Sequence, residues 1–106
     1  MMRSAAGALG AVMIAATLAA GSDIVVVQRN KTFSPHEIQI RVGDRVVFVN
    51  EDEVTHNVYS PTPGLEFNIR SQQPGQSDVV SFSKPGVLEV RCAIHPKMKM
   101  RVTVTR

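Results

Sequence analysis

The 106-residue sequence has a single cysteine, Cys92, no tryptophan and only 5% aromatic residues. One cysteine cannot form a disulfide within its own chain, so it is a buried free thiol, an intermolecular disulfide partner, a nucleophile or a metal ligand. The chain also lacks the Lys/Arg runs and aromatic platforms that nucleic-acid binding uses, so we expect no nucleic-acid partner. A domain this small has a shallow core, which a bound metal would help to stabilise.

The N-terminus has the layout of a secretory signal peptide, with Arg3 ahead of a largely apolar segment that ends in small residues. This segment is shorter than the roughly 20 residues of a membrane-spanning helix, and no charged stop-transfer flank follows it. An uncleaved anchor is the alternative. We expect cleavage near Ala20 or Gly21, with a signal peptide in residues 1–21 and a mature domain in 22–106. The mature domain would then be periplasmic, without a stable membrane anchor.

Beyond this segment, short β-rich runs alternate with turn signals, and no helical period is sustained. Seven or eight short strands at this spacing indicate an all-β fold, an antiparallel β-sandwich with Greek-key connections. The expected strands lie over residues 24–27, 38–42, 46–50, 56–60, 78–82, 87–92 and 100–105.

Residues 91–100, RCAIHPKMKM, combine a thiol, an imidazole and two thioethers. Strand alternation points Cys92 inward from the end of a strand, and His95 lies in the loop beyond it. The C-x2-H spacing alone is most often a buried structural cysteine beside a surface histidine. A thiolate, imidazoles and a thioether together favour copper, whereas zinc gains little from a methionine. His56, in NEDEVTHNVYS, supplies the second imidazole that such a site needs, and His36 is expected at the surface.

The segments FVNEDEVTHNV and KPGVLEVRCAIHPKM resemble the cupredoxins, the small blue copper proteins, and in particular their amicyanin and plastocyanin branch. This resemblance covers essentially the whole expected mature domain. It implies an eight-stranded Greek-key sandwich with one type 1 copper, ligated by His56, Cys92, His95 and a weak axial methionine. It also implies that Asn57 ties the two ligand loops together through hydrogen bonds. One departure is Ala93, where the family often has Ser or Thr, and it makes the reduction potential unpredictable from family averages.

Two methionines compete as the axial ligand. Met98 gives the amicyanin-like spacing H-x2-M, and Met100 gives the plastocyanin-like spacing H-x4-M. In the family, the axial methionine usually precedes the first inward valine of the closing strand by four residues, which points from Val102 to Met98. Pro96 favours a short, stiff loop that would bring Met98 under the copper. We therefore assign Met98 as the axial ligand and Met100 as a core residue.

A site with three strong ligands and a weak axial one leaves no open position for a substrate. The resemblance therefore implies a non-enzymatic, monomeric, periplasmic one-electron carrier, which shuttles electrons between redox proteins such as a dehydrogenase or a cytochrome. A protein of copper storage, delivery or resistance would use the same ligands and is the alternative. A Cys-His hydrolase would need an orienting third residue, which is not evident. An adhesion or interaction sandwich with an unpaired cysteine would not form a coloured copper complex.

The cations around the expected copper site are a further candidate feature. They would form a basic rim that attracts an acidic redox partner, although solvated charge is the default role of such residues. The rim would consist of Arg91, Lys97, Lys99 and Arg101.

Overall fold

Nine β-strands build the chain over residues 21–106, the range that this computed structural model describes. The expected signal peptide falls almost wholly outside this range, and so does the predicted cleavage at Ala20. Within residues 21–106, no helix is long and apolar enough to cross a membrane.

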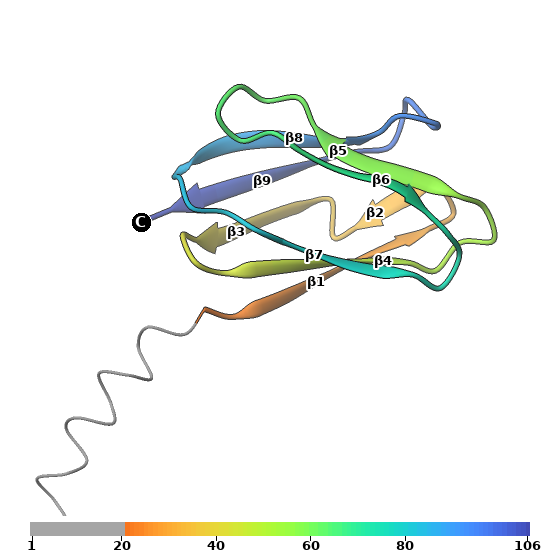
Figure 1. Cartoon of the computed structure of the whole chain (residues 1–106), viewed down its shortest axis with the longest axis horizontal. Helices are drawn as coiled ribbons and strands as arrows, with labels where there is room; N and C mark the ends of the chain where they lie inside the picture. Colours follow the sequence, from red (N-terminus) through yellow and green to blue (C-terminus); the bar gives the residue numbers. More distant parts are fainter. Residues whose placement is uncertain (1–20) are drawn as a thin grey trace, which may run out of the picture.

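The strands form two layers that lie face to face (Figure 1). A four-stranded sheet has the order β2-β1-β4-β7, with bounds Asp23–Arg29 for β1, Thr32–Ser34 for β2, Arg45–Asn50 for β4 and Ser77–Ser81 for β7. A five-stranded sheet has the order β3-β9-β8-β5-β6, with bounds Glu37–Arg41 for β3, His56–Ser60 for β5, Phe67–Gln72 for β6, Gly86–Cys92 for β8 and Lys99–Thr105 for β9. The predicted all-β sandwich is confirmed.

The strand count and the strand directions differ from the prediction. The sequence patterns did not predict β2, which has only three residues, or β6, which is irregular. The register of β6 against β5 shifts between Val58 and Tyr59, and Arg70 in β6 has a φ of 69°. The sheets are also mixed, because β1 pairs parallel with β4 and β3 pairs parallel with β9. Parallel neighbours need a crossover connection. Here the chain passes through the other sheet between β1 and β4, and again between β3 and β9.

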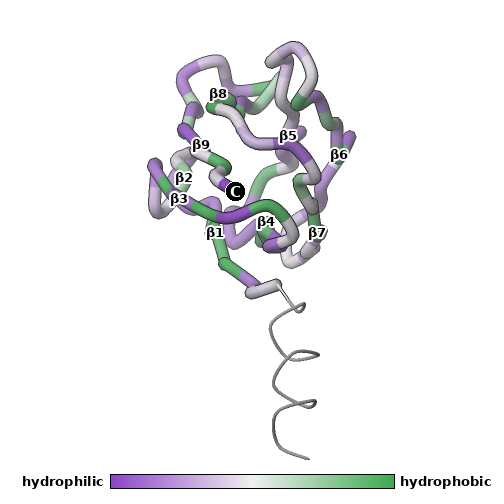
Figure 2. Tube along the Cα trace, turned by 90° about the vertical axis from the view of Figure 1, so that its left-hand side faces the viewer, coloured by the Kyte–Doolittle hydropathy of each residue, from purple (hydrophilic) through white to green (hydrophobic). Residues whose placement is uncertain are grey.

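The space between the layers is filled by side chains that alternate inward along each strand, and Figure 2 shows hydrophobic and hydrophilic segments alternating along the chain. Apolar residues fill most of it, chiefly Val26, Phe33, Ile40, Val46, Phe48, Val58, Leu88, Val90, Val102 and Val104. The end near His56 is different, since four fully buried polar side chains gather there: Gln28, Asn50, His56 and Gln72. That end of the core is therefore held by specific hydrogen bonds as well as by packing.

Candidate metal centre

The three expected strong ligands converge where β5 begins and β8 ends. In Figure 1 this is the end of the sandwich away from the C-terminus. His56 is the first residue of β5, Cys92 is the last residue of β8, and His95 lies in the loop between β8 and β9. Strands β5 and β8 are antiparallel neighbours, with Val58 opposite Cys92. The start of β5 therefore lies beside the end of β8, which brings residues 36 positions apart together.

The donor atoms of these residues form a small triangle. His56 Nδ1 lies 3.2 Å from His95 Nδ1, and Cys92 Sγ lies 3.7 Å from the first nitrogen and 3.8 Å from the second. A trigonal metal with bonds of about 2.0 Å to nitrogen and about 2.3 Å to sulfur needs nitrogen–sulfur separations of about 3.7 Å and a nitrogen–nitrogen separation of about 3.5 Å. The triangle fits one metal ion, and a thiolate with two imidazoles suits copper.

The backbone of Asn57 supports the thiolate. Its N–H donates to Cys92 Sγ at 3.3 Å, and its carbonyl oxygen accepts from the N–H of Ala93 at 3.0 Å. The side chain of Asn57 donates instead to Asn68 Oδ1 at 3.0 Å and to the carbonyl oxygen of Arg70 at 2.9 Å, both on β6. An N–H donor directed at the sulfur restrains its position and would hydrogen-bond to a metal-bound thiolate.

Met98 and Met100 are both buried, but they occupy different parts of the structure. Met98 lies in the loop before β9, where its N–H donates to the carbonyl oxygen of His95 at 2.9 Å. Its carbonyl oxygen accepts from the N–H of Cys92 at 3.3 Å. Met100 lies within β9, opposite Val90 of β8. The short loop therefore connects the backbone of Met98 directly to two of the clustered residues, whereas Met100 belongs to the strand.

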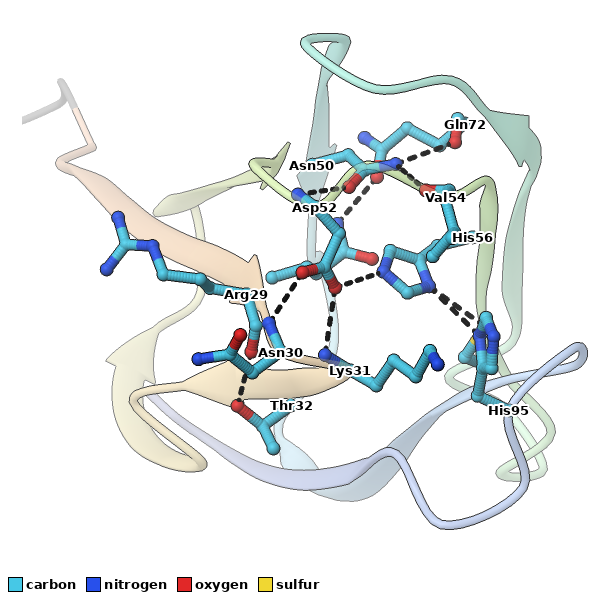
Figure 3. A network of polar contacts seen from close by, with 12 residues as sticks. Arg29, Asn30, Lys31, Thr32, Asn50, Asp52, Val54, His56, Gln72 and His95 are labelled. Atoms are coloured by element: carbon cyan, nitrogen blue, oxygen red, sulfur yellow. Dashed lines mark hydrogen bonds and ion pairs between the residues drawn. The ribbon is translucent and has the colours of Figure 1, made fainter.

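Asp52 is a polar neighbour of the cluster that the sequence analysis missed. Its Oδ2 lies 2.7 Å from His56 Nε2, and its carboxylate also accepts from the backbone N–H groups of Asn30 and Lys31 (Figure 3). Burial raises the pKa of the Asp52 carboxyl, but the hydrogen bonds from His56 and the two backbone N–H groups outweigh it and hold this pKa below its ordinary value. The signal in the sequence was a carboxylate four residues before the histidine.

His95 has a more open environment than His56. It is half-buried in its loop, and Lys31 extends toward it (Figure 3). Burial lowers the pKa of His95, and His56 and Lys31 lower it further, while the charge of Asp52 raises it. The residues on either side of it are exposed: Ala93, Ile94, Pro96 and Lys97. His36, expected at the surface, is exposed and does not belong to the cluster.

Comparison with known proteins agrees with this geometry. The sequence profile of copper-binding proteins of the plastocyanin/azurin family matches residues 22–105. The chain belongs to this family. The cupredoxin is 36% identical over 103 residues to amicyanin-alpha of Methylorubrum extorquens, covering 94% of this chain and 83% of that protein.

Solved structures also resemble this cupredoxin. The reduced Cu(I) form of an amicyanin mutant matches with a TM-score of 0.71 and 26% identity, over 77% of this chain and 81% of that chain. A copper-containing nitrite reductase from Thermus scotoductus matches with a TM-score of 0.74 and 28% identity, over 79% of this chain but 22% of the reductase. The family and the His–Cys–His donor set identify a single type 1 copper as the cofactor and one-electron transfer as the function.

Proposed function

We propose that this cupredoxin is a periplasmic, monomeric carrier that passes electrons between redox proteins and is not itself an enzyme. In this proposal His56, Cys92 and His95 are the strong copper ligands and Met98 is the weak axial ligand. The main support is the triangle of donor atoms, which fits one metal ion. Two of its corners, His56 and Cys92, lie on the neighbouring strands β5 and β8. The periplasmic location is supported by the signal-like N-terminal segment, which would leave residues 22–106 as the mature domain.

The protein's contribution is to hold the ligands still. When bound, copper supplies the change between Cu(I) and Cu(II), and its preferred geometry differs between these two states. His56 and Cys92 are buried and fixed by hydrogen bonds to Asp52 and to the backbone of Asn57. Restrained ligands limit rearrangement during oxidation and reduction, and this favours rapid electron transfer.

The enclosure of the ligands supports a carrier over an enzyme. His56 is 0% exposed and Cys92 is 2% exposed, and both direct their donor atoms at each other and at His95. A catalytic metal site instead keeps a position open to water or substrate. The match to nitrite reductase covers only 22% of that enzyme, so it supports a shared domain and not a shared reaction.

We propose that electrons enter and leave through His95, because it is the least buried of the three ligands. Two cations of the expected basic rim are already engaged, since Arg91 pairs with Glu89 and Arg101 pairs with Glu37. Three exposed lysines near the metal site, Lys31, Lys97 and Lys99, are in none of the ion pairs found within residues 21–106. Lys31 and Lys97 are the cations placed to attract an acidic partner, such as a dehydrogenase or a cytochrome, to His95.

The first test is to add Cu(II) to the purified mature domain and to record its visible and electron paramagnetic resonance spectra. We expect one equivalent to give an intense blue colour and type 1 resonance, and the colour should disappear and return over repeated reduction and oxidation. Copper storage or delivery, the alternative function, requires transfer of copper to an acceptor. Rapid copper transfer to a chelator without reversible redox cycling would favour that alternative.

The second test measures whether the charge of Lys97 affects the rate of electron transfer, with two small redox reagents that carry opposite charges. Lys97→Glu should slow oxidation by anionic ferricyanide several-fold at low salt and should accelerate oxidation by cationic tris(phenanthroline)cobalt(III), with both effects fading as salt screens the charges. Lys84→Glu is the matched control, because Lys84 is also exposed but precedes β8, at the end of that strand opposite to the metal site. Equal responses of the two variants would contradict electron entry beside Lys97.

A further inference from the structure

The imidazole of His56 lies between a carboxylate and the other two donors of the metal site. Its Nε2 is 2.7 Å from Asp52 Oδ2, while its Nδ1 faces Cys92 Sγ at 3.7 Å and His95 Nδ1 at 3.2 Å. An ionised carboxylate only accepts hydrogen bonds, so Nε2 must carry the proton of the neutral ring. That tautomer leaves the lone pair of Nδ1 free to bind a metal.

Asp52 is itself held in place by backbone N–H groups. Its carboxylate accepts from the N–H of Asn30 at 2.5 Å and from the N–H of Lys31 at 2.9 Å, in the turn between β1 and β2 (Figure 3). These two residues have φ values of 54° and 56°, and this conformation directs consecutive N–H groups to one anion. The side chain of Asp52 is 11% exposed, so its contact with His56 is partly shielded from water.

The loop that carries Asp52 is fixed by a fully buried asparagine. Asn50 Oδ1 accepts from the N–H of Asp52 at 2.9 Å, and Asn50 Nδ2 donates to the carbonyl oxygens of Val54 at 3.0 Å and Gln72 at 2.9 Å. Gln72 lies opposite His56 in the pairing of β5 with β6. The same network therefore positions the carboxylate and the strand that carries the histidine, which distinguishes this pair from a mobile surface ion pair.

We propose that Asp52 is a positioning residue of the copper site, which selects the Nδ1-binding tautomer of His56 and uses its negative charge to favour Cu(II) over Cu(I). This inference rests on the proposed role of His56 as a ligand. A carboxylate that accepts from the outer nitrogen of a ligating imidazole fixes the ring and makes it a stronger donor, and loss of such partners costs about 10–100-fold in metal affinity. A stronger, more negative ligand environment lowers the reduction potential.

The experiment compares Asp52→Asn and Asp52→Ala with Glu53→Gln in the full mature domain. Glu53→Gln removes a neighbouring, exposed carboxylate of the same loop, so it reproduces the change in net charge without touching His56. We expect Asp52→Ala to weaken Cu(II) binding 10–100-fold. It should also shift the one-electron equilibrium about tenfold toward Cu(I), which is a rise of about 59 mV. Asp52→Asn keeps an acceptor for Nε2 and should show a smaller loss of affinity.

A second measurement separates positioning from folding. Nitrogen-15 NMR of the Cu(I) wild-type protein should show a protonated His56 Nε2 with slow exchange, and Asp52→Ala should accelerate that exchange while Glu53→Gln should not. If both Asp52 variants match Glu53→Gln in Cu(II) affinity, potential and exchange, the inference is wrong even though the wild type is blue. If the wild type itself shows no type 1 spectrum, the proposed function fails instead.

Discussion

The two histidines of the metal centre sit in contrasting surroundings. His56 begins a strand, is fully buried and donates to Asp52, whose loop is fixed by Asn50. His95 lies in a loop, is half-buried and is flanked by exposed residues, including Ile94 at 50% exposure. Cys92 joins the two sides, since it ends β8 and starts the loop that contains His95.

This contrast separates two requirements of an electron carrier. The His56 side fixes the donor geometry through buried hydrogen bonds, where any lost partner is costly. The His95 side lies close to solvent, where a partner protein could approach this ligand of a bound copper and leave again. Substitutions on the first side should therefore change stability and the properties of the copper, while charge changes on the second side should change association rates.

The largest effect is expected where the two sides meet. Cys92→Ser removes the thiolate, so the intense blue charge-transfer band should disappear. Copper present at a hundredfold excess over its dissociation constant should stabilise the wild type by about 2.7 kcal/mol, and this gain should also be lost. Ala93→Ser is the control, because it alters the next residue and should leave the protein blue. A Cys92→Ser variant as blue as the wild type would refute the ligand assignment.

The His56 side should be the more costly one to disturb in folding. Asn50→Ala removes three side-chain hydrogen bonds at a fully buried position, with Asp52, Val54 and Gln72, and should lower the free energy of unfolding by about 2–4 kcal/mol. Urea unfolding of the copper-free protein measures this directly. Asn68→Ala removes two hydrogen bonds, from Asn57 and Arg70, but at an exposed position on β6 where water can replace them, and should cost less than about 1 kcal/mol. Equal losses for the two variants would mean that the buried network adds nothing specific.

Substitutions at the proposed axial ligand test how strongly the loop before β9 influences the reduction potential of the copper. Met98→Leu conserves apolar volume but removes the thioether, so the protein should stay blue while its reduction potential rises by about 59 mV or more, a tenfold change in the one-electron equilibrium. Met100→Leu should change the reduction potential little, because Met100 lies within β9, where it pairs with Val90 of β8. Voltammetry of both variants decides between them, and the reverse pattern would transfer the axial role to Met100.

The sequence predicted most of the fold and the gathering of His56, Cys92 and His95 at one place, because strand alternation and the run of soft donors are local patterns. Their roles as copper ligands stay a prediction. Inward alternation placed Cys92 at a strand end, and the soft donors around it indicated copper. It did not predict β6, where the shifted register and the positive φ of Arg70 break the alternation. Nor did the sequence predict the role proposed for Asp52. The contacts of Asp52 involve the turn at Asn30 and Lys31, which is more than 20 residues away in the chain and is brought close only by the tertiary structure.

The smallest effect is expected at Asp44, in the turn between β3 and β4. Its carboxylate accepts from the backbone N–H groups of Ser22 and Arg41 at 2.9 and 2.8 Å, and these bonds lower the pKa of Asp44 from its ordinary 3.8. A lowered pKa in the folded state contributes stability above the unfolded pKa, and this contribution is lost as pH falls through the folded pKa. Asp44→Asn should therefore be slightly less stable than the wild type near neutral pH, and the difference should shrink below about pH 4.

Urea unfolding of the copper-free protein between pH 7 and about pH 3 measures the Asp44 contribution. The reduction potential of Asp44→Asn should equal that of the wild type, because the β3–β4 turn contacts none of the clustered metal-site residues in the structure described for residues 21–106. A stability difference that grows on acidification would reverse the assigned sign of the pKa shift. A changed reduction potential would instead show that a charge far from the metal site, with no hydrogen bond to it, affects the copper. The copper's properties would then not be controlled locally by the His56 side, and the contrast between the two histidines would be wrong.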